Sequence, residues 1–547
     1  MLQITLFHRY RNRIVLTLIL GAFILLAARM FLYTEHFAVN MMFWDQWAVY
    51  KAFFNNVGLV DAFRFQHGPH RQGLGALLIY ITAQLTSWDG RADAYLVAGV
   101  LVIAAALALL LKYRYTGKLV FVDICIPVLF LSLNQWEQLT VVPNVSHSAL
   151  PLLLVMVYAI ALTLKQARAQ AIIMTIANFM LLYTGFGIFA AFITPLLFGY
   201  RSVTPESAGF AKSTRWIWMV SLLLSLLALL TFFQDWVFRP AVNCMIFPHP
   251  RPFEYVIFMG LQVSQGFGLA PMADQLEPAN AMAMVIGICM IFGAIGIAFQ
   301  SALSRRSVVI SFLVAFSLLF VINTALGRVC LGATQQPLSS KYATLVLPML
   351  LGIYLWSSQK SRNWQLAIGI SAISMIALAQ APPFYRDPYT GTPQTFHDIK
   401  VNWKTCYLAS LDPYTCDQVA QYQMFPRTEL IIGNLRYLEE NRLNLFNDVA
   451  RDVQINFPPN GSIVTESRIK LTGIINPPQF EHYEVQWGTG EFPSTWQWIS
   501  GPHKSPVINS QITEWDISQL PGGTFTIRVT VFLNNGSQRV ALTRFVK

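Results

Sequence analysis

Residues 14–33 read IVLTLILGAFILLAARMFLY and form the first of the long apolar runs that dominate this chain. The run is long enough to cross a bilayer as a helix, which takes about 20 apolar residues. It has no small-residue cleavage site, so we expect a retained membrane helix rather than a removed signal peptide. Arg9, Arg11 and Arg13 come just before it, and basic residues in this position place the N-terminus in the cytoplasm.

The rest of the chain has the same apolar character. Of its 547 residues, 54% are hydrophobic and 12% are charged, and the mean hydropathy of +0.47 is too high for a soluble protein of this length. Ten more apolar runs of spanning length or slightly less occur near residues 92–111, 119–133, 147–164, 169–183, 186–200, 216–234, 280–299, 307–323, 342–357 and 364–380. We therefore predict a mainly α, polytopic membrane helix bundle with about 11 spans.

Basic side chains set the orientation of these spans. They follow every second run, at Lys112, Arg114, Lys118, Lys165, Arg168, Arg201, Lys212, Arg215, Arg305, Arg306, Lys360 and Arg362. The positive-inside rule makes these loops cytoplasmic, and an odd number of spans then places the C-terminus on the periplasmic or extracellular face. No basic stripe is interleaved with aromatic residues, so we expect a lipid bilayer and no nucleic acid as partner.

Two shorter apolar stretches do not fit this alternation, Gly73–Ser87 and Tyr255–Ala270. Either one, counted alone as a span, would place the later basic loops on the wrong side of the membrane. We therefore assign both to interfacial or re-entrant helices on the outer face.

A polar, Pro-rich tail begins at Ala381-Pro382-Pro383. Apolar residues have helical spacing in Thr428–Asn447, whereas in Thr524–Phe532 they alternate with polar residues, as in a half-buried strand. A strand at Tyr483–Trp487 and a hairpin turn at Asn535-Gly536 complete the pattern of a small β-sandwich. We divide the chain into a transmembrane domain (1–380), a non-cytoplasmic, mostly helical linker region (381–455) and a non-cytoplasmic β-sandwich (456–547).

The six cysteines fall into two groups. Cys406 and Cys416 lie ten positions apart in a polar stretch, and they form a disulfide if that stretch faces an oxidising compartment. The other four lie in or beside apolar segments, where cysteine usually packs as a small hydrophobic residue. They are Cys125, Cys244, Cys289 and Cys330.

An acid between two tryptophans follows the first predicted span, in Phe43-Trp44-Asp45-Gln46-Trp47. A carboxylate at the membrane surface is suited to take a proton from an acceptor hydroxyl or to hold a metal, with Trp44 and Trp47 shaping the pocket. The alternative is a solvated Asp beside an interfacial aromatic belt. Glu137 lies in the second outer loop and is either a second acid or a solvated surface residue.

Basic groups occur in two further outer segments. His67, His70 and Arg71 lie in one loop and suit a phosphate at the level of the lipid headgroups. Arg328 and Lys341 flank a loop containing Gly and Ser and suit a diphosphate or a phosphosugar. The alternatives are contact with lipid phosphates for the first group and snorkelling at a helix end for the second. The residue patterns support no metal site and leave the cofactor unknown.

Residues 1 to about 380 resemble the GT-C class of integral membrane glycosyltransferases, which includes protein mannosyltransferases and lipid A aminoarabinose transferases. In that class a first helix leads to a long outer loop with an essential Asp, followed by a Pro-Pro-Leu-like stretch and a juxtamembrane helix. Asp45, His67–Arg71 and Gly73–Ser87 take these positions here. The chain departs from the pattern where Asp45-Gln46 replaces the usual Asp-Glu pair and where Gly68-Pro69 replaces Pro-Pro. The terminal domain is similar to fibronectin- or immunoglobulin-like modules of bacterial envelope proteins.

The resemblance implies transfer of a sugar from a polyprenyl-phosphate donor to an envelope glycan, lipid or protein acceptor. The reaction would occur at the outer face of the bacterial cytoplasmic membrane. Asp45 would act as base in an inverting displacement, and Arg71, Arg328 and Lys341 would neutralise the leaving phosphate. The alternatives are a transporter or flippase for a lipid-linked saccharide, and a non-catalytic envelope scaffold.

Overall fold

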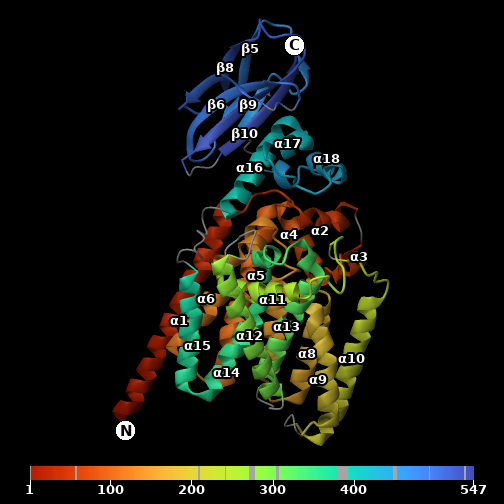
Figure 1. Cartoon of the computed structure of the whole chain (residues 1–547), viewed down its shortest axis with the longest axis vertical. Coiled ribbons are helices and arrows are strands. Elements are labelled where there is room, and N and C mark those ends of the chain that lie inside the picture. Colours follow the sequence, from red (N-terminus) through yellow and green to blue (C-terminus); the bar gives the residue numbers. More distant parts are fainter. Residues whose placement is uncertain are drawn as a thin grey trace.

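A computed structural model describes residues 2–55, 58–206, 210–240, 242–269, 277–302, 307–379, 392–447, 452–491, 493, 495–534 and 538–547. Three parts follow one another along its long axis (Figure 1). A body of helices contains the N-terminus at one end, a short helical segment lies on its opposite end, and a β region containing the C-terminus lies beyond that segment. The protein is therefore mainly helical, with its sheets confined to the C-terminal region.

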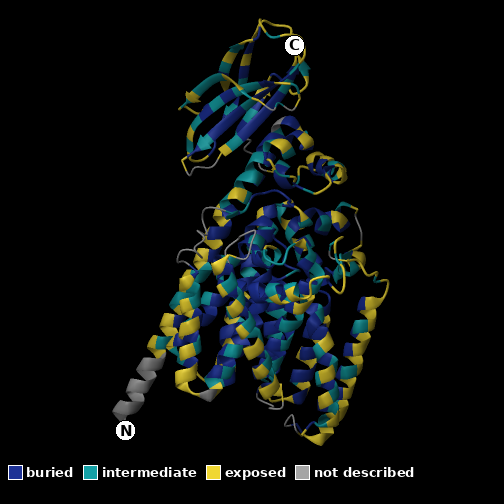
Figure 2. Ribbon diagram, in the orientation of Figure 1, coloured by how far each residue is buried: buried dark blue, intermediate teal, exposed yellow. Residues whose placement is uncertain are grey.

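Six helices within the described residues, with their adjoining 3-10 turns, are long and apolar enough to cross a membrane. They are α1 (Leu2–Phe37), α5 (Gly90–Thr116), α9 (Ile188–Val203), α10 (Arg215–Phe233), α12 (Pro278–Ala302) and α13 (Val308–Arg328). Figure 2 shows exposed residues along the outside of the body. On α10 these include Leu223, Leu226 and Leu230, and apolar side chains on the outer surface of a helix suit contact with lipid.

Helices also occur at the other five predicted spans, but none of them has more than 17 residues. They are α6 (Cys125–Phe130), α7 (Ala149–Ala161), α8 (Ala167–Leu182), α14 (Leu347–Lys360) and α15 (Arg362–Leu378). Irregular or 3-10 turns flank α6 and precede α14, where Pro348 lies in the first turn. A proline is favoured at such a helix start because its missing N–H is not needed there. The count of about 11 spans therefore stays a prediction.

A buried ion pair joins four helical elements at the end of the body opposite the β region. Lys112 Nζ lies 3.3 Å from Asp123 Oδ2, and both side chains are almost completely buried. The same carboxylate accepts hydrogen bonds from Tyr354 Oη on α14 (2.5 Å) and Gln365 Nε2 on α15 (3.3 Å). Lys112, which we had assigned to a cytoplasmic loop, is thus an internal residue of α5 whose charge is compensated by Asp123.

Short helices cover the other end of the body. They are α2 (Asp45–Phe54), α3 (Leu59–Arg64) and α4 (Gly73–Thr86), whereas α11 (Phe253–Ser264) packs beside α12. α4 and α11 lie at the stretches we predicted as interfacial. At the start of α4, Gly73 has φ +45°, and a Cβ on it would lie 2.0 Å from the carbonyl oxygen of Tyr183. Only glycine fits this close approach, which fixes the hairpin before α4 against the body.

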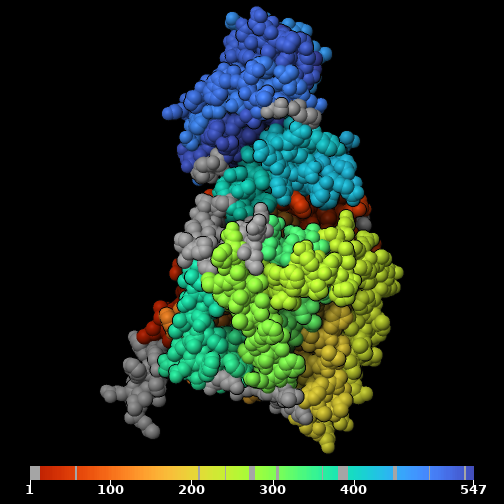
Figure 3. Space-filling view, viewed as in Figure 1, coloured from red at the N-terminus to blue at the C-terminus, as the bar shows by residue number. Residues whose placement is uncertain are grey.

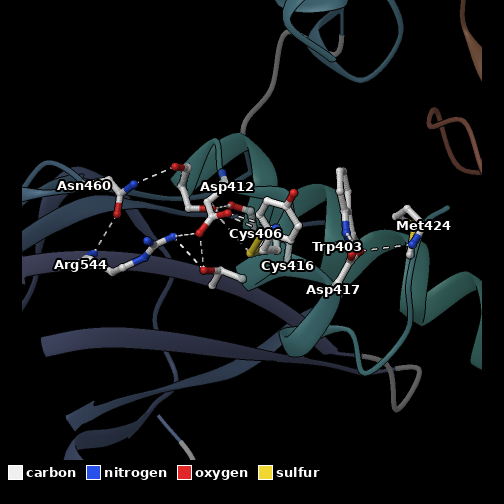
Figure 4. Close-up of a disulfide and its surroundings, with 11 residues drawn as sticks. Trp403, Cys406, Asp412, Cys416, Asp417, Met424, Asn460 and Arg544 are labelled. Carbon is white, nitrogen blue, oxygen red and sulfur yellow. Dashed lines mark hydrogen bonds and ion pairs between the residues drawn. A yellow bond between two sulfur atoms is a disulfide. The ribbon is translucent and has the colours of Figure 1, made fainter. Parts of the chain in front are cut away.

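The C-terminal segment consists of α16 (Thr392–Ser410), α17 (Pro413–Val419) and α18 (Ile432–Glu440). A disulfide joins Cys406 to Cys416 and ties α16 to α17 (Figure 4). Beside it, Arg544 forms an ion pair with Asp412, and Asn460 Nδ2 donates to the carbonyl oxygen of Ser410 at 2.7 Å. These contacts fasten the β region to the helical segment.

The β region contains two sheets. The first has five strands in the order β4-β10-β9-β6-β7, and the second has three in the order β3-β5-β8. The strands are β3 (Val453–Phe457), β4 (Ser462–Ile463), β5 (Arg468–Ile475), β6 (Phe480–Thr489), β7 (Gln497–His503), β8 (Val507–Asp516), β9 (Thr524–Leu533) and β10 (Gln538–Val546). Side chains from both sheets, among them Ile469 and Val529, belong to one hydrophobic core.

The two strands predicted from alternation lie within β6 and β9, which pair antiparallel. The first strand begins at Val453, before the predicted boundary at residue 456, because Val453 and Ile455 are buried where β3 pairs with β5. The predicted turn at Asn535-Gly536 lies outside the described residues, as do residues 380–391 at the start of the tail.

One cysteine prediction was wrong. Cys244 and Cys330 form a second disulfide, which joins the loop after α10 to the turn after α13. Each cysteine lies next to an apolar segment of the sequence but outside the membrane helix that this segment forms. Apolar neighbours in the sequence were therefore no evidence that these two cysteines pack inside a helix. Among the described cysteines, Cys125 is free and buried, and Cys289 is free and exposed.

Candidate functional site

A cavity of about 940 Å³ lies between the helical body and the C-terminal segment. Figure 3 shows this segment, in cyan, between the body and the β region. The cavity is lined by seven of the residues singled out in the sequence: Trp44, Asp45, His67, His70, Glu137, Arg328 and Lys341. They come from positions nearly 300 residues apart in the sequence, so the fold brings together the three outer segments that carry charged and imidazole groups.

Asp45 is the first residue of α2. A carboxylate in the first turn of a helix is favoured by the partial positive charge of the free N–H groups there. Asp45 is half-buried and its carboxylate forms no hydrogen bond or ion pair with any residue in the described part of the chain. The preceding residue is held by the C-terminal segment, because Trp44 N–H donates to the carbonyl oxygen of Met424 at 2.9 Å. Asp45 thus offers the cavity a carboxylate that makes no direct contact with a cation of the described residues.

The two residues after Asp45 point elsewhere. Gln46 Oε1 accepts from Phe43 N–H at 3.1 Å, and its Nε2 lies 3.4 Å from Asp93 inside the body. Trp47 is 2% exposed, stacks on Phe54 with ring centroids 6.2 Å apart and does not line the cavity. The prediction that Trp47 shapes the pocket was wrong, because the helical turn of α2 directs it into the core.

Two histidines face each other on a short hairpin formed by β1 (Gln66–His67) and β2 (His70–Arg71). His67 pairs with His70 across the two strands, with Gly68-Pro69 as the turn. Both rings line the cavity together with His147, whose ring centroid lies 5.8 Å from that of His67 and 6.1 Å from that of His70. The hairpin places the two side chains on one face because cross-strand partners project to the same side.

Burial keeps these three imidazoles neutral. It lowers the pKa of His67, lowers the pKa of His70 to about 3 and lowers the pKa of His147 well below its ordinary value. Repulsion between the rings and from Arg328 adds to the effect at His70 and His147, whereas Asp45 opposes it at His67. The histidines therefore serve as neutral hydrogen-bonding groups and contribute no positive charge to the cavity at pH 7.

Arg71 is not a cavity residue, which corrects our prediction. Its guanidinium is buried and donates to the carbonyl oxygen of Phe232 at 2.9 Å and to those of Arg64 and Gln234. It therefore caps the C-terminal ends of α3 and α10, where carbonyl groups lack helical partners. The physical reason is the alternation of a strand: His70 and Arg71 are adjacent, so their side chains project to opposite faces.

We expect Arg71→Ala to lower the free energy of unfolding by about 3 kcal/mol, because it leaves one buried and two partly buried carbonyl groups without their donor. The matched control is Arg64→Ala, which removes a partly exposed ion pair with Asp235 and should cost less than about 1 kcal/mol. Thermal unfolding of the detergent-solubilised protein measures both. Equal stability of the two variants would contradict the capping role.

Glu137 and Lys341 form an ion pair on the cavity wall, with Nζ and Oε1 3.1 Å apart. Burial acts to raise the pKa of Glu137, but Lys341 and the hydroxyl of Ser339 outweigh it, and the pKa lies below its ordinary value. The pKa of Lys341 is raised, because the attraction of Glu137 exceeds the opposing effect of burial. Much of the Lys341 charge is therefore already compensated.

Arg328 ends α13 and lies with Cζ 5.9 Å from the ring centroid of Tyr342. It forms no ion pair with a carboxylate of the described residues. Arg328 is therefore the cation best placed to meet an anionic ligand in this cavity. Within the same described residues, no group of three His, Cys, Asp or Glu side chains is arranged to hold a metal ion.

The cavity thus holds one carboxylate and one guanidinium that form no ion pair within the described residues, together with one ion pair and three neutral imidazoles. No family model, curated protein or solved structure matches this chain. Its function therefore has to be inferred from the chemistry of the cavity.

The structure also adds residues that our sequence analysis missed. Phe396 and Tyr422 of the C-terminal segment line the cavity, as do Trp136 and His147 of the body. Lys400 on α16 connects the two parts, since its Nζ donates to the carbonyl oxygen of Thr140 at 2.7 Å and lies 5.4 Å from the ring centroid of Phe43. Of these residues, only Trp136 could have been found from the sequence, because it is adjacent to the candidate acid Glu137.

Proposed function

We propose that the protein is a GT-C-type, inverting membrane glycosyltransferase that uses a polyprenyl-phosphate sugar as donor and an envelope glycan, lipid or protein as acceptor. The observation that carries the proposal is the cavity in which Asp45 and Arg328 both lack a partner of opposite charge within the described residues. One group is suited to accept a proton and the other to neutralise a phosphate.

In this mechanism the acceptor hydroxyl oxygen attacks the anomeric carbon of the donor. Asp45 takes the hydroxyl proton as the new C–O bond forms. The bond between the anomeric carbon and the phosphate oxygen breaks, and the electron pair leaves with the polyprenyl phosphate. Arg328, assisted by Lys341 and by N–H groups of the histidines, stabilises the charge that develops on the phosphate. The reaction requires no nucleotide and no redox partner.

The proposed location is the outer face of the bacterial cytoplasmic membrane, with the N-terminus cytoplasmic and the C-terminal region periplasmic or extracellular. Both disulfides support it, since Cys244–Cys330 and Cys406–Cys416 lie on the cavity side of the body, and disulfides persist in oxidising compartments. We further propose that the five shorter helices complete a set of about 11 spans and that the two sheets with their common core form a β-sandwich.

Deletion of the gene tests the proposal through the mass profile of the envelope glycans. The expected result is the loss of one kind of sugar residue, restored by the native gene. Accumulation of an intact lipid-linked saccharide with no change in its composition would instead indicate a transporter or flippase. An unchanged profile would exclude transfer to the envelope and favour a scaffold.

A further inference from the structure

Five aromatic side chains form a continuous surface on one side of the cavity, which we call the aromatic wall: Phe43, Trp44, Trp136, Phe396 and Tyr422. Tyr422 lies with its ring centroid 5.7 Å from that of Phe43 and 6.2 Å from that of Trp44. Phe396 lies 5.9 Å from Phe43 and 6.2 Å from Trp136. Trp44 is 38% exposed, so part of this surface is available to a ligand.

The wall is built from two parts of the chain that are far apart in sequence. Phe43, Trp44 and Trp136 belong to the helical body, whereas Phe396 and Tyr422 belong to the C-terminal segment. The segment is fixed beside Tyr422, because Asp417 accepts from Trp403 Nε1 at 2.8 Å and from Met424 N–H at 3.2 Å (Figure 4). The carbonyl oxygen of Met424 in turn accepts from Trp44 N–H. These hydrogen bonds fix the position of the segment, and with it the positions of Phe396 and Tyr422 relative to the other three rings.

Polar residues also line the same cavity. Four residues that line the cavity each have a buried polar atom with no hydrogen bond in the described part of the chain: Gln138 Oε1, Asn144 Nδ2, Ser148 Oγ and Tyr342 Oη. Buried polar atoms are nearly always satisfied, so such a group beside a cavity indicates water or a ligand with many hydroxyls. The hydrocarbon chain of a lipid has no hydrogen-bonding groups and would leave these atoms without partners.

The combination of flat aromatic surface and scattered hydrogen-bonding atoms matches a pyranose. Its C–H groups form an apolar face that packs on aromatic rings, while its hydroxyls radiate from the ring edge. The cavity volume of about 940 Å³ is also large enough for a saccharide in addition to a phosphosugar headgroup. A phosphate group, by contrast, would bind to the Arg328 guanidinium.

We propose that the acceptor is a saccharide that binds on the aromatic wall and that the C-terminal segment, through Phe396 and Tyr422, supplies two of the five rings that bind it. This inference rests on the proposed glycosyltransferase function and names the acceptor class of the same cavity. The segment is then a part of the substrate site, and the body alone would recognise the donor but bind the acceptor poorly.

The test measures binding of oligosaccharides released by mild acid from the envelope glycans of the deletion strain. Saturation-transfer NMR and tryptophan fluorescence follow their binding to the full-length protein in detergent. Tyr422→Ala is expected to weaken binding about five- to tenfold, the effect of losing one aromatic contact, whereas Tyr422→Phe should bind like the native protein. Tyr414→Ala is the matched control, because Tyr414 is exposed on the neighbouring helix α17 and does not line the cavity.

If Tyr422→Ala does not fold, Phe396→Leu serves instead, because it keeps the apolar bulk and removes the flat ring. No binding to the native protein, or binding that neither variant weakens, would overturn the inference. The glycan profile of the deletion strain tests the proposed function separately. Ring-dependent binding together with an unchanged profile would mean that the wall binds saccharides in a protein that transfers none.

Discussion

Replacement of Asp45 by Asn should lower sugar transfer by about 10²- to 10⁴-fold, the usual contribution of a general base. The amide keeps the size of the side chain but cannot take the proton of the acceptor hydroxyl. Because the Asp45 carboxylate has no partner among the described residues, its loss removes no ion pair, and the folded protein should be as stable as the native one. The glycan mass profile of a complemented deletion strain and the unfolding temperature measure the two effects.

Asp61→Asn is the matched control for this experiment. Asp61 is also in the first turn of a neighbouring short helix, but it is exposed and does not line the cavity. The same substitution there should leave transfer unchanged. Full activity of Asp45→Asn would contradict the assignment of the base and direct attention to Glu137, the other carboxylate of the cavity. Loss of activity in both variants would show that the substitution acts through a general loss of protein.

Lys112→Met is expected to destabilise the protein by about 3–5 kcal/mol, because it leaves Asp123 as an uncompensated charge in the interior. Asp123 also receives hydrogen bonds from α14 and α15, so the effect should reach all the helices that meet there. Thermal unfolding in detergent and the amount of protein in the membrane are the measurements.

A double variant separates the effect of charge from the effect of packing. Lys112→Met with Asp123→Asn removes both charges and keeps an oxygen that accepts from Tyr354, so it should recover much of the lost stability. Lys118→Met, at an exposed position of the same region, should cost little. A double variant less stable than Lys112→Met alone would contradict the claim that Lys112 stabilises the protein by compensating the charge of Asp123.

Hydropathy located most helices of the body, since each predicted apolar run contains a helix in the structure, but it gave no sign of the short helices α2 and α3. It was less reliable for their length. A run of apolar residues fixes burial, but the point where a helix ends depends on local groups such as Pro348 and on contacts from other elements, as at α6 and α14. Alternation of apolar and polar residues likewise located β6 and β9, because that pattern lies within each strand. It missed the start of β3, which depends on pairing with β5.

The charged residues of the cavity could be predicted from the sequence. The direction of each side chain, into the cavity or away from it, could not. Trp47 lies two positions after Asp45 and Arg71 lies next to His70, yet Trp47 is directed into the core and Arg71 caps two helices. A change of one position reverses the face of a strand and turns a helix side chain by about 100°. Tyr422 gave no sign, because its role depends on a contact with residues near the opposite end of the chain.

The composite origin of the aromatic wall has a consequence for biosynthesis. Trp44 leaves the ribosome early, but Tyr422 follows only about 380 residues later, a delay on the order of a minute at about 5–20 residues per second. Under the proposed function, a nascent chain that has been made as far as Lys341 already contains the donor groups Arg328 and Lys341, but it has no completed wall for an acceptor until Tyr422 follows. A truncated product of translation would therefore be able to sequester donor without consuming it, and for the cell the stringent removal of such fragments would matter as much as the synthesis of the full protein.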